Sequence, residues 1–156
     1  MADQAYSHAG VTLHISTTAQ NSDLDDHASS GFPSLTYTEV KNVGSIGEYG
    51  IDTNMISYDM LSTAVSRKAK GITNAGDPEV EVARDDTDPG QLLMRAAGAV
   101  SNHNSYAFKV VKQDGSIDYL RGLVAGPNSP SGRNEDFDLH VFALALNQEP
   151  VHVNAP

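Results

Sequence analysis

The chain has 156 residues, with no cysteine, no tryptophan and an aromatic share of only 6%. Without cysteine, disulfide bonds, thiolate metal sites and cysteine nucleophiles are all excluded. Basic residues are also scarce, because 10 Lys and Arg stand against 20 Asp and Glu, for a formal net charge of −10. Nucleic-acid-binding proteins draw affinity from cations that neutralise phosphates, and an anionic membrane surface repels an acidic protein. This balance therefore argues against both kinds of partner.

Long apolar runs are missing as well. No stretch approaches the roughly 20 apolar residues that span a bilayer. Residues 1–10 have neither the basic region nor the apolar run of a signal peptide. We therefore expect a protein that is made in the cytoplasm and not inserted into a membrane. The length suits a single domain, residues 1–156, with one core.

Short segments of alternating apolar and polar residues predict half-buried strands. These expected strands are residues 11–15, 34–40, 56–67, 79–83, 105–111, 117–125 and 137–146. Asp114-Gly115 predicts a tight type I′ turn in a hairpin. Residues 17–33 and 126–134 are expected to be loops, residues 66–71 a basic turn, and residues 147–156 a loose tail.

One helix is predicted from Pro89 to about Val100. Asp88 suits the N-cap position, and Pro89 suits the first helical position, where no N–H partner is needed. Apolar residues recur at helical spacing and predict a stripe that lies against a sheet, namely Leu92, Leu93, Ala96, Ala97 and Val100. The expected fold class is mainly β, a sandwich or barrel with one flanking helix.

Residues 41–60 form a glycine-studded excursion that carries more apolar side chains than a solvent loop should. Gly44, Gly47 and Gly50 argue against one regular core strand. The apolar residues are Ile46, Tyr49, Ile51, Met55, Ile56, Tyr58 and Met60. Contiguous exposed apolar groups usually mark a partner surface. The first hypothesis is therefore self-assembly, with this excursion as an inter-subunit loop.

Other candidate sites are weaker. The six histidines lack the spacing that places two metal ligands on one face. The acidic clusters 23–27 and 85–88 lack the complete pattern of a calcium loop. The three glycines are not followed by the helix of a phosphate loop, and no Gly-x-Ser-x-Gly elbow is present. We therefore expect no enzyme, no metal and no cofactor. Arg67, Lys68 and Lys70 are expected to pair with acidic groups, including those of an adjacent subunit.

Three features together resemble the major tail tube proteins of long-tailed bacteriophages and the tubes of gene transfer particles. The first is Tyr37-Thr38-Glu39-Val40 followed by the excursion 44–50, and the second is the basic segment 67–71. The third is Asp88-Pro89-Gly90-Gln91-Leu92-Leu93 with the later Asp114-Gly115 hairpin. The resemblance covers about residues 10–151 through the order and spacing of these segments.

The resemblance implies a β-sandwich subunit that forms hexameric rings, which stack into a hollow tube in the virion tail. DNA would pass through without specific binding, and the tape-measure, tail terminator and baseplate or distal tail proteins would be partners. The N-terminal arm 1–10 and the tail 147–156 would become ordered on assembly. The strands near 34–40, 56–67, 105–111 and 117–125 would include the channel wall, with Glu39, Asp59 and Asp118 as acidic groups that repel DNA.

Two other interpretations of the sequence remain open. One is a related ring, such as a tube protein of a secretion system or another phage-like particle. The other is a small β-fold hydrolase or carbohydrate-binding module, which would need a concave site with convergent polar groups.

Overall fold

The computed structural model describes residues 7–62, 64–130, 132–134 and 136–156, so most of the predicted N-terminal arm 1–10 lies outside the described residues. The strands are β1 (Thr12–Ala19), β2 (Tyr37–Val40), β3 (Val43–Ile46), β4 (Asp52–Tyr58), β5 (Arg67–Asn74), β6 (Glu79–Ala83), β7 (Tyr106–Val111), β8 (Ile117–Asn128), β9 (Leu139–Leu146) and β10 (Val151–Val153). The helices are the 3-10 turn η1 (Phe32–Ser34) and α1 (Pro89–Ala97). The mainly β prediction with one α-helix is confirmed.

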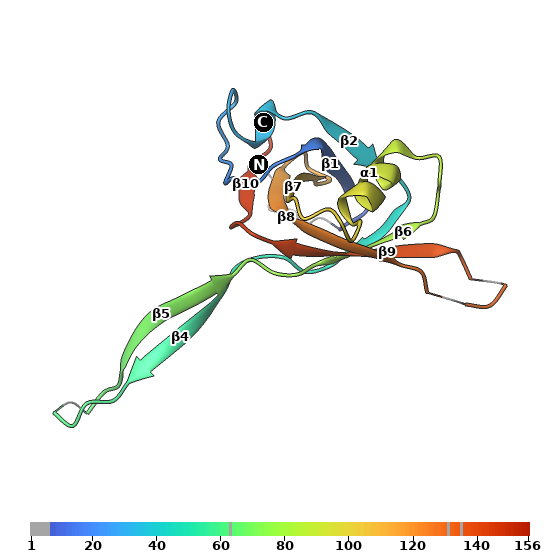
Figure 1. The fold of residues 1–156 in the computed structure, drawn as a ribbon. Coiled ribbons are helices and arrows are strands. Elements are labelled where there is room, and N and C mark those ends of the chain that lie inside the picture. Colours follow the sequence, from blue (N-terminus) through green and yellow to red (C-terminus); the bar gives the residue numbers. More distant parts are fainter. Residues whose placement is uncertain (1–6, 63, 131, 135) are drawn as a thin grey trace.

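The body of the molecule is one eight-stranded antiparallel sheet, ordered β2-β1-β7-β8-β9-β6-β3, with β10 paired to β8. β4 and β5 form a separate two-stranded sheet, which projects from the body as a long hairpin (Figure 1). On the opposite side of the body, the connection from β8 to β9 also projects (Figure 1).

The large sheet curls around a single core. Buried side chains from β1, β2, β6, β7, β8 and β9 all belong to one apolar cluster, which a flat sheet could not bring together. On β9 the alternation buries His140, Phe142, Leu144 and Leu146 on the core face. β8 and β9 approach so closely at Gly122 that a Cβ there would lie 2.3 Å from the carbonyl oxygen of Ala145.

Helix α1 begins at Pro89 as predicted, but it ends at Ala97 and buries a different face. The buried positions are Gly90, Gln91, Met94 and Ala97. Leu92 is 46% exposed, Val100 is 96% exposed and Ala96 is exposed as well, so the predicted stripe was wrong at these three positions. Gln91 replaces an apolar residue on the core face because its side-chain amide donates to the carbonyl oxygens of Lys41 and Ala83.

Asp88 joins the helix to the sheet. Its carboxylate accepts hydrogen bonds from the backbone N–H of Gln91, as the predicted N-cap, and from that of Lys41, beside β2. Loss of an N-cap side chain costs about 0.5–2 kcal/mol. We expect Asp88→Ala to lower the free energy of unfolding by about 2 kcal/mol, since it removes both bonds. Urea denaturation measures this loss, and a change below about 0.5 kcal/mol would contradict the assignment.

The turn between β7 and β8 differs from the predicted type I′ turn. Gly115 has φ of +92°, while Asn42 is the non-glycine residue with positive φ in the described chain. Asp114 therefore keeps a negative φ. The Gly115 N–H donates to the Lys112 carbonyl, and the Lys112 N–H donates to that of Ser116. The glycine thus sits in the left-handed position that follows a type I turn in many hairpins.

A second, smaller buried cluster lies on the outer face of the sheet, opposite the main core. Phe32 stacks on Tyr119 with ring centroids 5.1 Å apart, and Ala107 completes the buried cluster. Part of the predicted loop 17–33 covers this cluster, although β1 extends to Ala19. The predicted loose tail is partly a strand, because β10 pairs with the first residues of β8 and packs Val151 and Val153 here.

Candidate assembly surfaces

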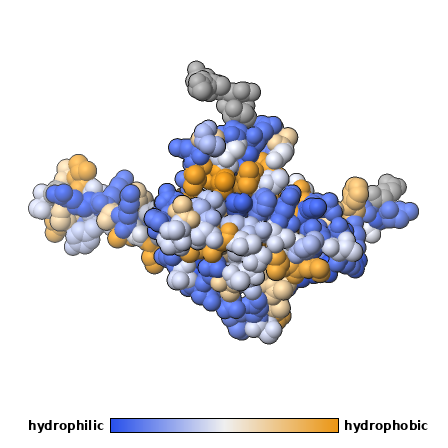
Figure 2. All heavy atoms as spheres, turned by 90° about the horizontal axis from the view of Figure 1, so that it is seen from above, coloured by the Kyte–Doolittle hydropathy of each residue, from blue (hydrophilic) through white to orange (hydrophobic). Residues whose placement is uncertain are grey.

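The projecting hairpin, which we call the arm, comprises residues 51–74. The structure corrects two predictions here, because neither a glycine-rich loop 41–60 nor a strand 56–67 is present. β3 instead pairs with β6 in the body, and β4 pairs with β5 where a basic turn was expected. Along the arm, apolar side chains are more than half exposed: Ile51, Met55, Ile56, Tyr58, Leu61, Val65 and Ile72. Figure 2 shows apolar and polar side chains mixed along this projection.

The two faces of the arm differ in chemistry. Residues paired directly across an antiparallel ladder lie on the same face. One face therefore carries Ile56 opposite Ala69 and Tyr58 opposite Arg67. The other face carries Met55 opposite Lys70 and Ser57 opposite Lys68. The first is an apolar face with one guanidinium, and the second is largely cationic.

The predicted contact residues fall into two groups. Met55, Ile56, Tyr58, Arg67, Lys68 and Lys70 all lie exposed on the arm, and Ile51 lies exposed at its base. Ile46 and Tyr49 do not belong to the arm, because both are half-buried and pack against the main core. Ile46 is held there because β3 pairs with β6. Tyr49 is held because the backbone of its neighbours Gly47 and Gly50 donates hydrogen bonds to the carbonyl oxygens of Glu79 and Ala75.

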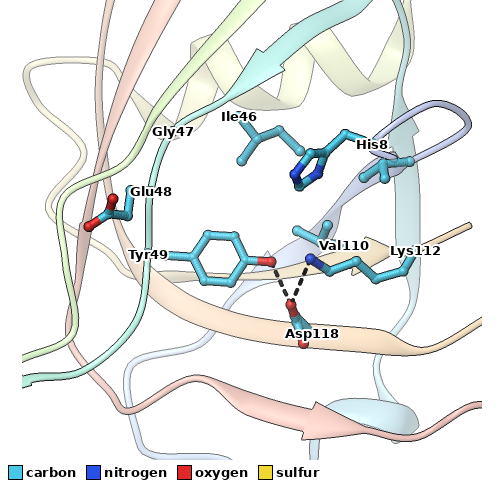
Figure 3. Close-up of a pocket in the computed structure, with 9 residues that line it drawn as sticks. His8, Ile46, Gly47, Glu48, Tyr49, Val110, Lys112 and Asp118 are labelled. Atoms are coloured by element: carbon cyan, nitrogen blue, oxygen red, sulfur yellow. Dashed lines mark hydrogen bonds and ion pairs between the residues drawn. The ribbon is translucent and has the colours of Figure 1, made fainter. Parts of the chain in front are cut away.

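Tyr49 is fixed by a buried carboxylate. Its hydroxyl donates to Oδ2 of Asp118 at 2.5 Å, and Lys112 Nζ lies 3.4 Å from the same oxygen (Figure 3). Nδ1 of His152 lies 2.5 Å from Oδ1 of Asp118, which ties β10 to β8. The Asp118 side chain is only 13% exposed. The carboxylate is therefore engaged within this subunit, and its place on a channel wall stays a prediction.

These contacts determine the direction in which the pKa of the Asp118 carboxyl is shifted. Burial by itself raises the pKa of its carboxyl, but hydrogen bonds from His152 and Tyr49 and the charge of Lys112 leave that pKa below the usual 3.8. Burial, followed by the Asp118 hydrogen bond, raises the pKa of Tyr49 above its ordinary range. The phenol therefore stays protonated and acts as the donor.

We expect Asp118→Asn to flatten the loss of stability in acid. A carboxyl with a lowered folded-state pKa stabilises the fold above its unfolded pKa and loses this effect as pH falls through the folded value. The wild type should therefore lose stability below about pH 5 more steeply than the variant. Urea midpoints measured from pH 7 downward check this, with Asp59→Asn as the control at an exposed loop carboxyl. Parallel curves for wild type and Asp118→Asn would contradict the expectation.

A cavity of about 560 Å³ opens beside this cluster. Tyr49 and Lys112 point across it toward Asp118, with His8 and Ile46 on its border (Figure 3). The Asp118 oxygens are already engaged by these neighbours and by His152, so the cluster serves to pin the tail and the segment after β3. Among the described residues, no group of three His, Asp or Glu side chains is placed to hold a metal ion.

The predicted acidic clusters are structural within the described chain. In residues 85–88, Asp88 caps α1, Asp85 accepts from Thr87, and Asp86 pairs with Arg84 and Arg95. Hydrogen bonds from Arg95 and Arg84 lower the pKa of Asp86. In residues 23–27, Asp23 pairs with the buried Arg121. Glu39 on β2 and Asp59 beyond β4 are exposed.

An apolar groove of about 480 Å³ lies over the outer face of β8 and β9, and the sequence patterns considered above did not predict it. Its lining includes Val100, Leu123, Ala125, Ala143 and Ala145. One signal could have indicated it. β9 is apolar on its outer face as well as its core face, and strands with two apolar faces are usually covered on both.

No helix among the described residues is long and apolar enough to span a bilayer. No family model and no curated protein sequence matches the chain.

Solved structures match in fold. A chain in the cryo-EM structure of an extracellular contractile injection system, the PVC sheath/tube terminator in its extended state, has a TM-score of 0.67 at 8% identity, over 99% of this chain and 100% of that one. A chain in the baseplate of the anti-feeding prophage, 6-fold symmetrised, has a TM-score of 0.64 at 8% identity, over 99% and 98%. A chain in the PVC sheath-tube complex has a TM-score of 0.60 at 8% identity, over 93% and 88%. Over nearly its whole length, the chain therefore shares its fold with chains of contractile injection systems.

Proposed function

We propose that this chain is a ring-forming subunit of the tube in a phage-tail-like particle. The observation that carries the proposal is a fold shared over 99% of the chain with chains from such particles, combined with an arm that exposes its apolar side chains. Apolar surface left in water is unfavourable by about 25 cal/mol per Å². A neighbouring copy would remove this surface from water.

The finer form of the proposal is that six copies close into a ring and that rings stack into a conduit. Closed rings pair the exposed sheet edges of neighbouring subunits, and both end strands of this sheet, β2 and β3, have one such edge. The net charge of −10 suits a conduit wall that does not retain DNA, with Glu39 and Asp59 as candidate wall residues. Tape-measure, terminator and baseplate proteins would be its partners in a particle tail.

The source of the matching structures modifies the expectation from sequence. They belong to contractile injection systems, whereas the sequence resembled tubes of long-tailed phages. We therefore propose a subunit of a phage-tail-like tube in general rather than of a long-tailed phage in particular. A terminator ring is the second candidate, because the match to a chain in the sheath/tube terminator structure covers 100% of that chain.

Negative-stain microscopy of the concentrated, purified chain, together with sedimentation velocity, tests the proposal. A tube subunit should form stacks of rings, and these stacks should become longer as concentration rises. A terminator should form single rings that do not stack. A chain that remains monomeric at every concentration would overturn both candidates.

A further inference from the structure

We infer that the groove on the outer face of β8 and β9 receives the arm of a second copy of this chain. This inference rests on the proposed function and names the contact that would join its subunits. The groove lies on an apolar sheet face, where Leu123 is 37% exposed and Ala125, Ala143 and Ala145 line the floor. Val100, in the turn after α1, borders it and is 96% exposed. Small floor residues leave room for large side chains from outside.

The apolar face of the arm complements this floor. Ile56 is 53% exposed and Tyr58 is 70% exposed, and both lie on the same face of the hairpin. Nothing in the described part of their own subunit covers these large side chains, and the alanines of the groove leave space for side chains of that size. Because the arm projects away from its own body, a second copy is the source of the partner surface (Figure 1).

Charge favours the same occupant. Of the 10 basic residues, three lie in the arm, together with two of the 20 acidic ones, so the arm carries +1 and the rest of the sequence −11. Among the described residues, no Lys or Arg lines the groove, whereas Asp77 and His103 do, and Glu79 lies exposed next to Ala143 in the paired strand. Arg67, on the same face as Tyr58, would meet this acidic side of the groove. Opposite charges across a contact give it specificity and fix its register.

The contact would be heterologous, because arm and groove are different surfaces. Each copy then gives one arm and receives another, which generates a closed ring or an open stack of subunits according to the rotation between neighbours.

Cross-linking tests the inference directly, because the natural chain has no cysteine. One chain carries Ile56→Cys and a second carries Ala125→Cys, and the two are mixed, assembled and treated with a short bis-maleimide. We expect a cross-linked pair of the two chains at least 10-fold more abundant than with the control acceptor Thr17→Cys, an exposed position on β1. Microscopy of the same samples reports whether rings or tubes have formed.

Each outcome separates the inference from the proposed function. Assemblies that contain the cross-link between positions 56 and 125 support both. Assemblies in which this product does not exceed the Thr17→Cys control overturn the groove as the acceptor and leave the tube function standing. If neither assemblies nor products form, both are overturned.

Discussion

The double variant Ile56→Asp with Tyr58→Asp is expected to abolish assembly while the subunit stays folded. Both side chains are more than half exposed on the apolar face of the arm and lie outside the core, so they add little to the stability of the folded monomer. In an assembled contact, the carboxylate at position 56, opposite Ala69, would be buried without a partner, which costs several kcal/mol. The change at position 58, opposite Arg67, removes the apolar ring from the contact. Since about 1.4 kcal/mol is a tenfold change in affinity, the concentration needed for assembly should rise by at least about 100-fold.

Sedimentation of a dilution series measures this concentration, and circular dichroism with thermal unfolding confirms that the subunit remains folded. The matched control is Ile56→Val with Tyr58→Phe, which keeps the apolar face and should assemble as the wild type does. Assembly of the Asp variant at wild-type concentrations would show that this face of the arm lies outside the contacts.

Most strands of the body, though not β3 or β10, could be predicted because their environment has two distinct sides. On β6, Val80 and Val82 face the core while Glu79 and Glu81 face outward, and the alternation in sequence records that difference directly. The first residue of α1 could also be predicted from the sequence, since Asp88 and Pro89 act through local backbone chemistry. Its buried face was not, because Gln91 is held in the core by carbonyl groups distant in sequence.

The arm shows where this reasoning fails. A hairpin surrounded by solvent has no inner face, so β4 and β5 show no consistent alternation between buried and exposed positions. Lys68 and Lys70 therefore suggested a turn, although they lie on a strand. Self-assembly was still a sound hypothesis, because the excess of apolar side chains depends on composition rather than on strand boundaries.

Tyr49 illustrates a different limit. Its distance of 69 residues from Asp118 hides their hydrogen bond from any local pattern, so the aromatic ring looked like part of the exposed excursion. Tyr49→Asp is therefore unsuitable as a test of assembly, because it would place a second carboxylate against Asp118. Ile56 and Tyr58 are the appropriate positions, because their side chains lie outside the body.

The second large effect is expected in the core. Phe142 on β9 is fully buried at 0% exposure, with its ring edge-on to His140 at 6.3 Å between centroids. Phe142→Ala removes most of this side chain and leaves a cavity, which costs about 3–5 kcal/mol. Domains are stable by only about 5–15 kcal/mol, so the variant should lose about a fifth or more of this margin. A fall in melting temperature on the order of 10 °C should follow.

Thermal and urea unfolding of the monomer measure this loss, with Ile56→Ala as the matched control because it removes an apolar side chain from the arm. That control should change the free energy of unfolding by less than about 0.5 kcal/mol, yet it should weaken assembly. Phe142→Ala should show the reverse order, with a large loss of stability and, at temperatures where it is folded, a normal arm. Equal stability losses in the two variants would mean that the arm is part of the folding core, and the separation between folding and assembly surfaces would fail.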